Sequence, residues 1–259
     1  MTTKIREIIT YHELLWNLTV TELKLRYRNS ALGFLWTILN PLFYLLILAV
    51  VFSQIIKLRM EHYTVFLFSG LTSWMMIQQT VIIATSSIVN NQSLIRKVYI
   101  PKLVFPLSNA LARYMDHAVL VLILLAFLPV FGMRLSWSLL FIPPIVLLHF
   151  VFSLGLSLLF AVAQIKVRDV QQIVSIVFQA LFYATPVIYS LDLLPERLRP
   201  VFLFNPVYYF VEGLRWPVYR AAPPPWNVWL AMTGLAAAAF LAGYSIFIRK
   251  EKYFVFHLS

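Results

Sequence analysis

The chain of 259 residues contains no cysteine and only seven glycines. Without cysteine it forms no disulfide and has neither a thiol nucleophile nor a cysteine metal site, and its redox environment stays open. The glycines cannot form the G-x-x-x-x-G-K-[S/T] phosphate-binding loop, because no two lie five residues apart and none precedes a lysine. The H-E-x-x-H zinc motif is also absent. These absences exclude ATP hydrolysis by that loop and metal chemistry by that motif.

Charged side chains are scarce, at 12% of the chain, whereas hydrophobic residues make up 61%. A soluble domain of this length needs far less apolar sequence, so lipid has to cover the excess. Six apolar stretches each come near the roughly 20 residues that cross a bilayer as a helix. We therefore predict an all-α membrane protein with six transmembrane helices, at Leu32–Ile56, Val65–Ile88, Leu107–Phe131, Leu139–Ala163, Ile173–Tyr189 and Val228–Ile248.

Basic residues are unequally divided between the two sides of these spans. Of the 21 lysines and arginines, 13 lie on the side that holds both termini, seven lie on the other side, and Arg113 lies inside a span. The positive-inside rule then places both termini in the cytoplasm. The segments between spans are too short for a separate soluble domain. We expect one membrane domain over residues 1–259, with a cytoplasmic interface helix in 1–31, a six-span bundle in 32–248, an external hairpin in 191–227 and a cytoplasmic tail in 249–259.

The first 30 residues lack the apolar core of a signal peptide, so the N-terminus is expected to be retained. Tyr11, Leu14, Leu15, Leu18 and Leu25 can share one face of an amphipathic helix in this region. Such a helix is either an interface anchor or a docking surface for a cytoplasmic partner.

Few ionisable residues fall inside the spans. Arg113, Asp116 and His117 follow the i, i+3, i+4 spacing of one helix face, which favours a self-satisfied ion pair over a catalytic cluster. We place Arg113 near the cytoplasmic interface, where its side chain can reach the headgroups. His149 is expected to be a hydrogen-bonded packing residue. Ion-coupled carriers usually need ionisable residues at depth, so the energy for active transport is expected from another subunit.

The cytoplasmic segment Asn90–Pro106 contains Pro101 and Pro106, which prevent a continuous helix. Ser93 can cap a short helix that ends at Val98 or Tyr99. A short helix with exposed apolar side chains suits docking into a groove of another protein. An ordinary charged loop that sets topology is the alternative.

The outer segment Leu191–Asn227 holds seven of the fourteen prolines and many aromatic residues. Asn205 followed by Pro206 is typical of a helix start. We predict two short helices, Pro195–Leu203 and Pro206–Val218, that enter the outer leaflet without crossing it. Irregular backbone at membrane depth is tolerated against protein or a water-filled cavity, so this hairpin is expected to border a pathway. An aromatic belt that anchors interfacial helices is the alternative.

Uncharged polar and aromatic residues share spans one, two and five. Amides occur at Asn40, Gln78, Gln79 and Gln179, and Phe178, Phe182 and Tyr189 form a predicted stripe. Sugars stack their C–H faces on aromatic rings while their hydroxyls seek hydrogen bonds, so this mixture suits a saccharide pathway. Aromatic stripes also commonly pack helices together or face lipid.

Four runs in order resemble ABC-2 type permeases that export polysaccharides and polyol phosphates, with O-antigen exporters as the strongest likeness. The runs are ELKLRYRNSALGFLWTILNPL at Glu22–Leu42, LIRKVYIPK at Leu94–Lys102, ATPVIY at Ala184–Tyr189 and FNPVYY at Phe204–Tyr209. The resemblance covers nearly the whole chain. It implies a homodimer in the bacterial inner membrane that exports a polysaccharide linked to undecaprenyl diphosphate. It also implies two copies of a separate subunit that binds the ATP, while this chain binds no cofactor.

The resemblance further assigns roles to residues of this chain. It implies a channel between spans one and five at Trp36, Asn40, Phe43, Tyr44, Phe178, Phe182 and Tyr183; an external gate at Pro195, Phe204, Asn205, Pro206, Tyr208 and Tyr209; and an ATPase-coupling helix at Ser93, Leu94, Ile95, Arg96, Lys97, Val98 and Tyr99. We add the hypothesis that Arg28 and Arg113 meet the lipid diphosphate at the cytoplasmic entrance.

Other functions stay open at this point. A teichoic-acid or capsule exporter of the same family is the nearest alternative, and drug or lipid exporters of the superfamily usually have larger external domains. A membrane enzyme for lipid-linked sugars would need an acid or base, for which Asp116, Asp192, Glu196 and Glu212 are the candidates. An ATP-independent channel, carrier or flippase would move substrate without nucleotide.

Overall fold

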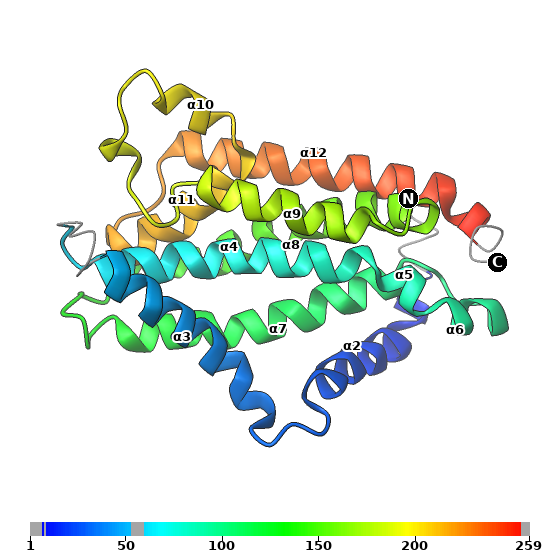
Figure 1. The fold of residues 1–259 in the computed structure, drawn as a ribbon. Helices are drawn as coiled ribbons and strands as arrows, with labels where there is room; N and C mark the ends of the chain where they lie inside the picture. Colours follow the sequence, from blue (N-terminus) through cyan, green and yellow to red (C-terminus); the bar gives the residue numbers. More distant parts are fainter. Residues whose placement is uncertain (1–6, 8, 53–59, 255–259) are drawn as a thin grey trace.

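The computed structural model describes residue 7, residues 9–52 and residues 60–254. Every regular element in these ranges is a helix, which confirms the predicted all-α class. The long helices lie side by side in one bundle (Figure 1). The start of α2 (His12–Tyr27), the short α6 (Gln92–Lys97) and the end of α12 (Trp226–Lys250) lie at one end of it, and α10 (Arg199–Leu203) lies at the other.

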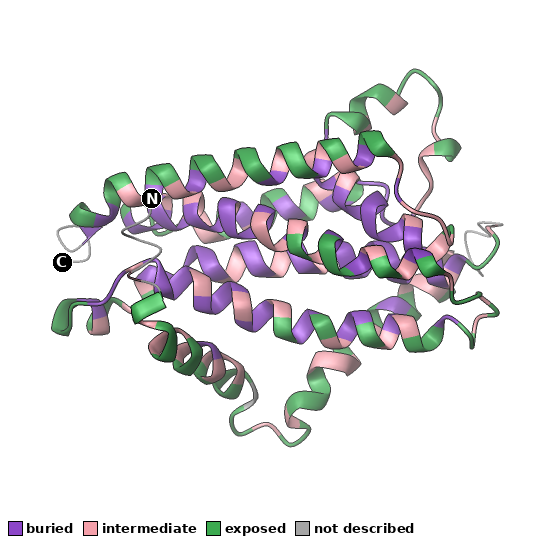
Figure 2. Ribbon diagram, turned by 180° about the vertical axis from the view of Figure 1, so that it is seen from behind, coloured by how far each residue is buried: buried purple, intermediate pink, exposed green. Residues whose placement is uncertain are grey.

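Helix α4 (Tyr63–Thr85) forms the centre of the bundle. It packs against α7 (Val104–Phe127), α8 (Ile142–Lys166) and α11 (Pro206–Tyr219). Buried residues occur all round α4, whereas they are confined to one face of α12 (Figure 2). A helix that is apolar all round is typical of a position that is buried on every side or that faces lipid, and α4 occupies the first of these.

Two glycines bring α8 and α12 together. A Cβ atom added at Gly155 would clash with the backbone of Ala239, and one added at Gly243 would clash with the backbone carbonyl of Gly155. Small residues allow helix backbones to approach closely in membranes, where packing rather than the hydrophobic effect drives association. The longest helix pair of the bundle therefore depends on these two positions.

Five helices in the described ranges are long and apolar enough to cross a bilayer. The 3-10 turns η1 (Gly33–Leu35), η3 (Trp137–Phe141) and η5 (Glu251–Tyr253) extend three of them. They correspond to five of the six predicted spans, although the predicted end of the first span, at Ile56, lies outside the described residues. The five are Gly33–Val50, which contains α3 (Trp36–Val50), Tyr63–Thr85, Val104–Phe127, Trp137–Lys166 and Trp226–Tyr253.

The fifth predicted span is shorter than expected. Helix α9 runs only over Val170–Tyr183, 14 residues, and the predicted end at Tyr189 is wrong. Pro186 disfavours helical backbone at the residue before it, and the chain turns at 184–187. Tyr189 therefore does not continue the helical stripe of Phe178 and Phe182.

Helix α3 is poorly covered. In the apolar stretch of this span only 17% of the residues are buried, against 72% in the apolar stretch of α4. The N-terminal end of α3 slants away from the bundle, and a short loop joins that end to α2 (Figure 1). Phe43, Leu46 and Ile47 are all more than half exposed. An apolar helix with this much uncovered surface needs lipid or another protein chain against it.

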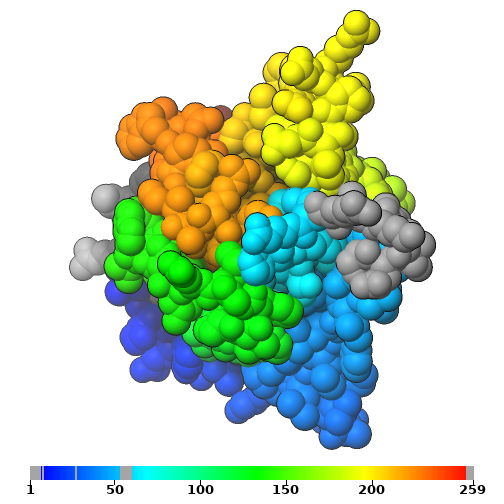
Figure 3. Space-filling view, turned by 90° about the vertical axis from the view of Figure 1, so that its left-hand side faces the viewer, coloured from blue at the N-terminus to red at the C-terminus, as the bar shows by residue number. Residues whose placement is uncertain are grey.

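The outer segment differs from the predicted hairpin in its first half. The structure has η4 (Leu191–Leu193), turns, and then α10 only from Arg199, because Pro200 lacks an N–H and suits a first helical turn. This half projects beyond the body of the bundle (Figure 3). The second helix, α11, starts at Pro206 as predicted and ends at Tyr219, one residue beyond the prediction. It is buried against α4, α8 and α12 instead of lying at the periphery.

The segment after α4 continues as α5 (Ser87–Asn90) and α6. The helix predicted at Ser93 is present, but its start is wrong: Asn91 holds the N-cap position, Ser93 lies inside α6, and the helix ends at Lys97. Val98 is extended and ends the helix three residues before Pro101.

The predicted N-terminal helix is α2, and Leu14, Leu15 and Leu18 pack against a buried cluster near the α6 end of the bundle. The prediction that Leu25 shares this face is wrong, since Leu25 is 53% exposed. Toward its C-terminal end, α2 is held to α7 by an ion pair instead of by apolar contact.

Candidate functional site

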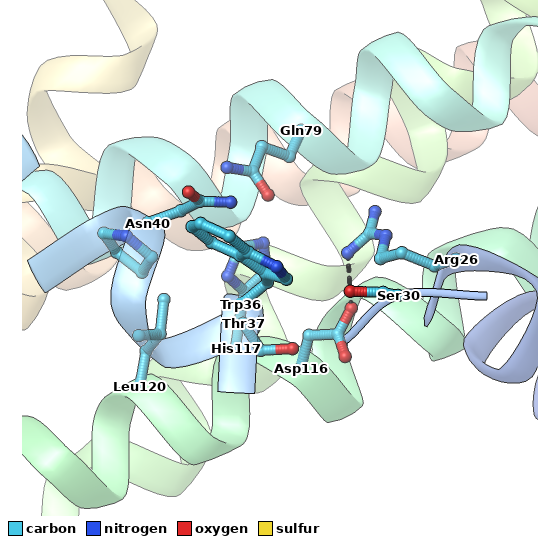
Figure 4. A pocket seen from close by; sticks show the side chains of 10 residues that line it. Arg26, Ser30, Trp36, Thr37, Asn40, Gln79, Asp116, His117 and Leu120 are labelled. Carbon is cyan, nitrogen blue, oxygen red and sulfur yellow. Dashed lines mark hydrogen bonds and ion pairs between the residues drawn. The ribbon is translucent and has the colours of Figure 1, made fainter. Parts of the chain in front are cut away.

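A cavity of about 410 Å3 lies among α2, α3, α4 and α7 (Figure 4). We call it the Trp36 cavity. It combines an indole, two amides, an imidazole and an ion pair. These groups are unusually polar for a cavity in a bundle of apolar helices. Its lining consists of Arg26, Ser30, Trp36, Thr37, Asn40, Pro41, Gln79, Asp116, His117 and Leu120.

The ion pair in this cavity has three members. Asp116 accepts from Arg26 at 2.6 Å and lies 3.1 Å from an Arg113 nitrogen through the same carboxylate oxygen. The Arg113 and Asp116 side chains are each only 4% exposed. This confirms the ion pair predicted from the spacing, and it adds Arg26, which lies 90 residues away in the chain. Arg113 does not reach toward the headgroups, because its carboxylate partner lies within one helical turn.

His117 is the unusual member of the cavity. It is 2% exposed, and in the described part of the chain neither ring nitrogen has a hydrogen-bond partner. By contrast, His149 is hydrogen-bonded at both ring nitrogens, to Ser73 at 2.8 Å and to the Ile145 carbonyl at 2.8 Å, which confirms its packing role. Buried polar groups are costly unless they are paired, so His117 is a group with unused binding capacity beside a cavity.

A second cavity, of about 460 Å3, lies between α3, α4 and α9. We call it the Trp74 cavity. Its lining consists of Tyr44, Trp74, Met75, Gln78, Gln179, Phe182 and Tyr183. The Trp74 indole N–H donates to the Gln78 side-chain oxygen at 2.9 Å, and its ring meets Phe178 and Phe182 edge-on at 5.7 and 5.4 Å. The ring orientation in this cavity is therefore set by α4 and α9 together.

The seven predicted channel residues do not form one group. Trp36 and Asn40 line the Trp36 cavity, and Tyr44, Phe182 and Tyr183 line the Trp74 cavity. Phe43 lines neither cavity and is 52% exposed. Phe178 is buried beneath Trp74.

Two residues that line these cavities, Trp74 and Arg26, could not be predicted as site residues from the sequence. Trp74 was not proposed because an aromatic residue in a buried helix gives no signal of its own, although Gln78 one turn later is its partner. Arg26 was not proposed because its partner, Asp116, lies on a distant helix.

The two predicted entrance arginines have different places. Arg28 is exposed and is not part of the Trp36 cavity. Arg113 is buried with its charge opposed by Asp116. Arg26 is the arginine that lines the cavity.

Among the predicted external gate residues, Asn205 is held in place by three side-chain hydrogen bonds. The Asn205 side chain caps α11 by accepting from the Val207 N–H at 3.0 Å, and its Nδ2 donates to Thr185 Oγ1 at 2.7 Å and to the Ala184 carbonyl at 3.0 Å. The turn after α9 and the start of α11 are thus joined by one side chain. Pro206 occupies the first turn of α11.

The other gate residues lie around this anchor. Phe204 is 88% exposed, and Pro195 is exposed. Tyr208 and Tyr209 stack edge-on at 5.2 Å, and the Tyr209 hydroxyl donates to the Leu203 carbonyl at 3.0 Å.

A buried arginine fixes α11 to the same turn. Arg215 donates to the Pro186 and Val187 carbonyls at 3.0 and 3.1 Å and to Glu212 at 2.6 Å. Its guanidinium carbon lies 3.7 Å from the centre of the Phe66 ring. Burial lowers the pKa of Arg215 from its ordinary value, and the Glu212 carboxylate opposes that shift.

Acidic residues give little support to an enzyme. Asp116 and Glu212 are each held by two arginines. Asp192 and Glu196 are exposed in the outer segment. No group of three metal-ligating side chains occurs in the described ranges. Asp116 does line the Trp36 cavity, but its carboxylate is engaged by Arg26 and Arg113.

The predicted coupling helix has one buried anchor and an exposed tip. Ile95 is 7% exposed and belongs to a cluster with Ile100, Leu103 and Leu158. Ser93, Arg96, Lys97, Val98 and Tyr99 are exposed, and Leu94 is half-buried. The next segment is held by Glu251 at the end of α12, whose carboxylate accepts from the Lys102 N–H at 3.1 Å.

Comparison with known proteins agrees with this architecture. Residues 13–219 match the family model of the ABC-2 type transporter. The chain is 33% identical over 196 residues to the O-antigen export system permease protein RfbA of Klebsiella pneumoniae, which covers 75% of this chain and 76% of that protein.

Two further relatives extend the comparison. The RfbA permease of Myxococcus xanthus is 30% identical over 252 residues, covering 96% of this chain and 97% of its own length. The polysialic acid transport protein KpsM of Escherichia coli is 25% identical over 207 residues, covering 75% of this chain and 77% of its own. The chain is therefore a multi-pass membrane protein that belongs to the ABC-2 type transporter family.

Proposed function

We propose that this chain is the transmembrane permease subunit of an ABC exporter that moves a polysaccharide of the O-antigen type across the bacterial inner membrane. The polymer is linked to undecaprenyl diphosphate and passes through a channel between two copies of the chain. ATP is bound and hydrolysed by a separate subunit, present in two copies, and this chain binds no cofactor. The O-antigen export function for which the RfbA relatives are named, and the long alignments to them, support this proposal.

The observation that carries the channel is the uncovered face of α3 beside the Trp74 cavity. Tyr44 and Tyr183 are exposed on α3 and α9, and Gln179 lines the same cavity as both rings. A second copy of the chain placed against these helices would enclose them. Many weak stacking contacts suit a moving sugar chain, because no single site holds it tightly.

The membrane topology proposed here has six spans, with α9 and the turn that follows it as the fifth. Fourteen helical residues rise about 21 Å, less than the roughly 30 Å of the hydrocarbon core. The buried turn Thr185–Ile188 and the Asn205 anchor carry the chain toward the outer surface. Both termini lie in the cytoplasm, in agreement with the bias in basic residues.

Coupling to ATP hydrolysis is proposed through α6. Arg96, Lys97, Val98 and Tyr99 offer an exposed tip to the ATP-binding subunit, and Ile95 joins that tip to the bundle. Movement of the partner would then be transmitted to α7 and α8 through the Ile95 cluster. The outer segment with Phe204 and Asn205 is proposed as the external gate.

A capsule exporter is the second candidate, supported by the similarity to KpsM. A teichoic-acid exporter has no such observation in its favour. A membrane enzyme or an ATP-independent flippase is less well supported, since the candidate acids are in ion pairs or exposed.

The test is ATP hydrolysis and polymer export by the complex of this chain with its ATP-binding subunit, in lipid. We expect ATPase activity from the complex only, and export of the polymer to the surface of cells that depend on this chain. Tyr99→Asp should lower ATPase activity and export together by at least tenfold. Leu135→Asp, at an exposed position in the loop between two spans, serves as the control for an added charge. An ATPase that is indifferent to Tyr99→Asp, or export without the ATP-binding subunit, would contradict the proposal.

A further inference from the structure

The Trp36 cavity lies beside the proposed channel surface but is distinct from it. Trp36, Asn40 and Tyr44 follow one another at four-residue intervals along α3, and the first two line the Trp36 cavity whereas Tyr44 lines the Trp74 cavity. On α4, Gln79 faces the first cavity and Gln78 the second. Neighbouring side chains of the same two helices therefore line two different cavities, and Asn40 and Tyr44 are about one helical turn, or 6 Å, apart along α3.

We propose that the Trp36 cavity binds one uncharged sugar ring of the saccharide before it enters the channel. The proposal rests on the proposed function and adds a selection site within the permease. At about 410 Å3, the cavity falls in the range of roughly 300–1,000 Å3 typical of small-molecule sites.

The lining matches the two faces of a sugar. Trp36 lines the cavity and is 38% exposed, so its ring is available to the C–H face of a pyranose. The Asn40 and Gln79 amides lie on the facing helices α3 and α4 (Figure 4), and each offers a donor and an acceptor to hydroxyl groups. The arrangement resembles a stacking platform edged by hydrogen-bonding groups.

His117 gives the observation that points to a ligand. Its imidazole is 2% exposed and lines the cavity, and neither ring nitrogen has a partner in the described part of the chain. A neutral imidazole carries one donor and one acceptor, which is the pair that a sugar hydroxyl can satisfy. A buried imidazole without partners is unfavourable in an apolar bundle, and a bound hydroxyl removes that cost.

The charge of the cavity favours an uncharged ring over the lipid diphosphate. Arg26 and Arg113 share the Asp116 carboxylate, at 2.6 and 3.1 Å. A diphosphate would have to compete with this carboxylate for both guanidinium groups and would lie within range of its negative charge. The hydroxyl groups of a sugar meet the same ion pair without repulsion.

The test is binding of methyl glycosides to the complex in lipid nanodiscs, followed by saturation-transfer NMR. The panel contains methyl hexosides and methyl N-acetylhexosaminides, with pyrophosphate as the probe for the anionic alternative. We expect binding of at least one glycoside. His117→Phe, which keeps the ring and removes both nitrogens, and Gln79→Leu should each weaken that binding at least tenfold.

Gln172→Leu is the matched control, because it removes the same amide from an exposed position of α9 that lines neither cavity. It should leave glycoside binding within twofold of the wild type. If His117→Phe does not fold, Asn40→Leu at an exposed position replaces it.

The inference fails if no glycoside binds, if pyrophosphate alone binds, or if Gln172→Leu weakens glycoside binding as much as Gln79→Leu does. The ATPase and export assays on the same samples keep the two proposals apart. Coupled ATPase activity and export without glycoside binding would overturn the selection site and leave the exporter standing. Glycoside binding without coupled ATPase activity or export would overturn the exporter.

Discussion

Asn205 and Thr185 lie 20 residues apart in the chain, and the Asn205 amide donates to the Thr185 hydroxyl over 2.7 Å. The same side chain caps α11 through the Val207 N–H. One residue therefore closes the loop that contains the projecting α10, and it joins the end of α9 to the start of α11. This relationship makes Asn205 the most defined point of the proposed external gate.

We expect Asn205→Ala to destabilise the protein by about 1–3 kcal/mol, because it removes a helix cap and leaves the Thr185 hydroxyl without this donor. Thermal unfolding in detergent measures the change. Asn227→Ala, at an exposed position in the first turn of α12, is the control and should change stability by less than about 0.5 kcal/mol. Equal effects of the two substitutions would show that the Asn205 contacts do not hold the gate.

The Asp116 carboxylate joins α2 to α7, and its two arginines contribute unequally. Arg26→Met should release the end of α2 with a modest loss of stability, since the Arg26 side chain is 30% exposed. Asp116→Asn should cost more, about 3–5 kcal/mol, because it leaves the buried Arg113 without its carboxylate. Hydrogen exchange of the α2 amides measures the first effect and unfolding measures the second.

Lys24→Met is the control for Arg26→Met, since it removes the same charge from an exposed position of α2. Exchange that rises equally in both variants would mean that the ion pair does not hold α2.

The contact between Gly155 and Gly243 predicts a position-specific effect of alanine on α12. Gly243→Ala should destabilise the bundle by about 1–3 kcal/mol or more, because its Cβ atom would meet the Gly155 backbone, which cannot yield as a flexible side chain can. Gly234→Ala is the matched control on the same helix, where a Cβ atom meets nothing within 4 Å. It should be neutral or slightly stabilising, by up to about 1 kcal/mol, because alanine favours helix. Unfolding in detergent decides, and a neutral Gly243→Ala would refute the close approach of α8 and α12.

Arg215 predicts a loss of order at the turn after α9. Arg215→Met removes the donors to the Pro186 and Val187 carbonyls and leaves Glu212 with Arg220 at 3.5 Å as its remaining ion-pair partner. We expect faster hydrogen exchange in 184–190 and a destabilisation of about 3–5 kcal/mol. Adding Glu212→Leu should recover part of that loss, because the buried carboxylate is then gone.

Arg197→Met, in the exposed outer segment, should leave exchange at 184–190 unchanged. If the double variant is no more stable than Arg215→Met alone, then the carboxylate is not the source of the loss.

Local signals in the sequence were sufficient to predict that the protein lies in lipid, that it is all-helical, and where several helices start. Apolar stretches about as long as a bilayer requires indicate lipid directly. Asn205 followed by Pro206 predicts the start of α11 because the N-cap hydrogen bond and the proline preference both act within one turn. The same locality explains the misplaced cap at Ser93, since Asn91 is an equally good N-cap residue two positions earlier. The end of α9 was overestimated because apolar character continues past Tyr183 although the backbone turns before Pro186.

Long-range packing alone settled how the polar residues are grouped. Spacing along α7 predicts the pair of Arg113 and Asp116, but the Arg26 partner comes from 90 residues away. Periodicity gives a face for each helix and not the helix that will cover it. For that reason the division of α3 between the Trp36 and Trp74 cavities, and the unpartnered His117 beside Trp36, follow only from the way in which α2, α3, α4 and α7 meet.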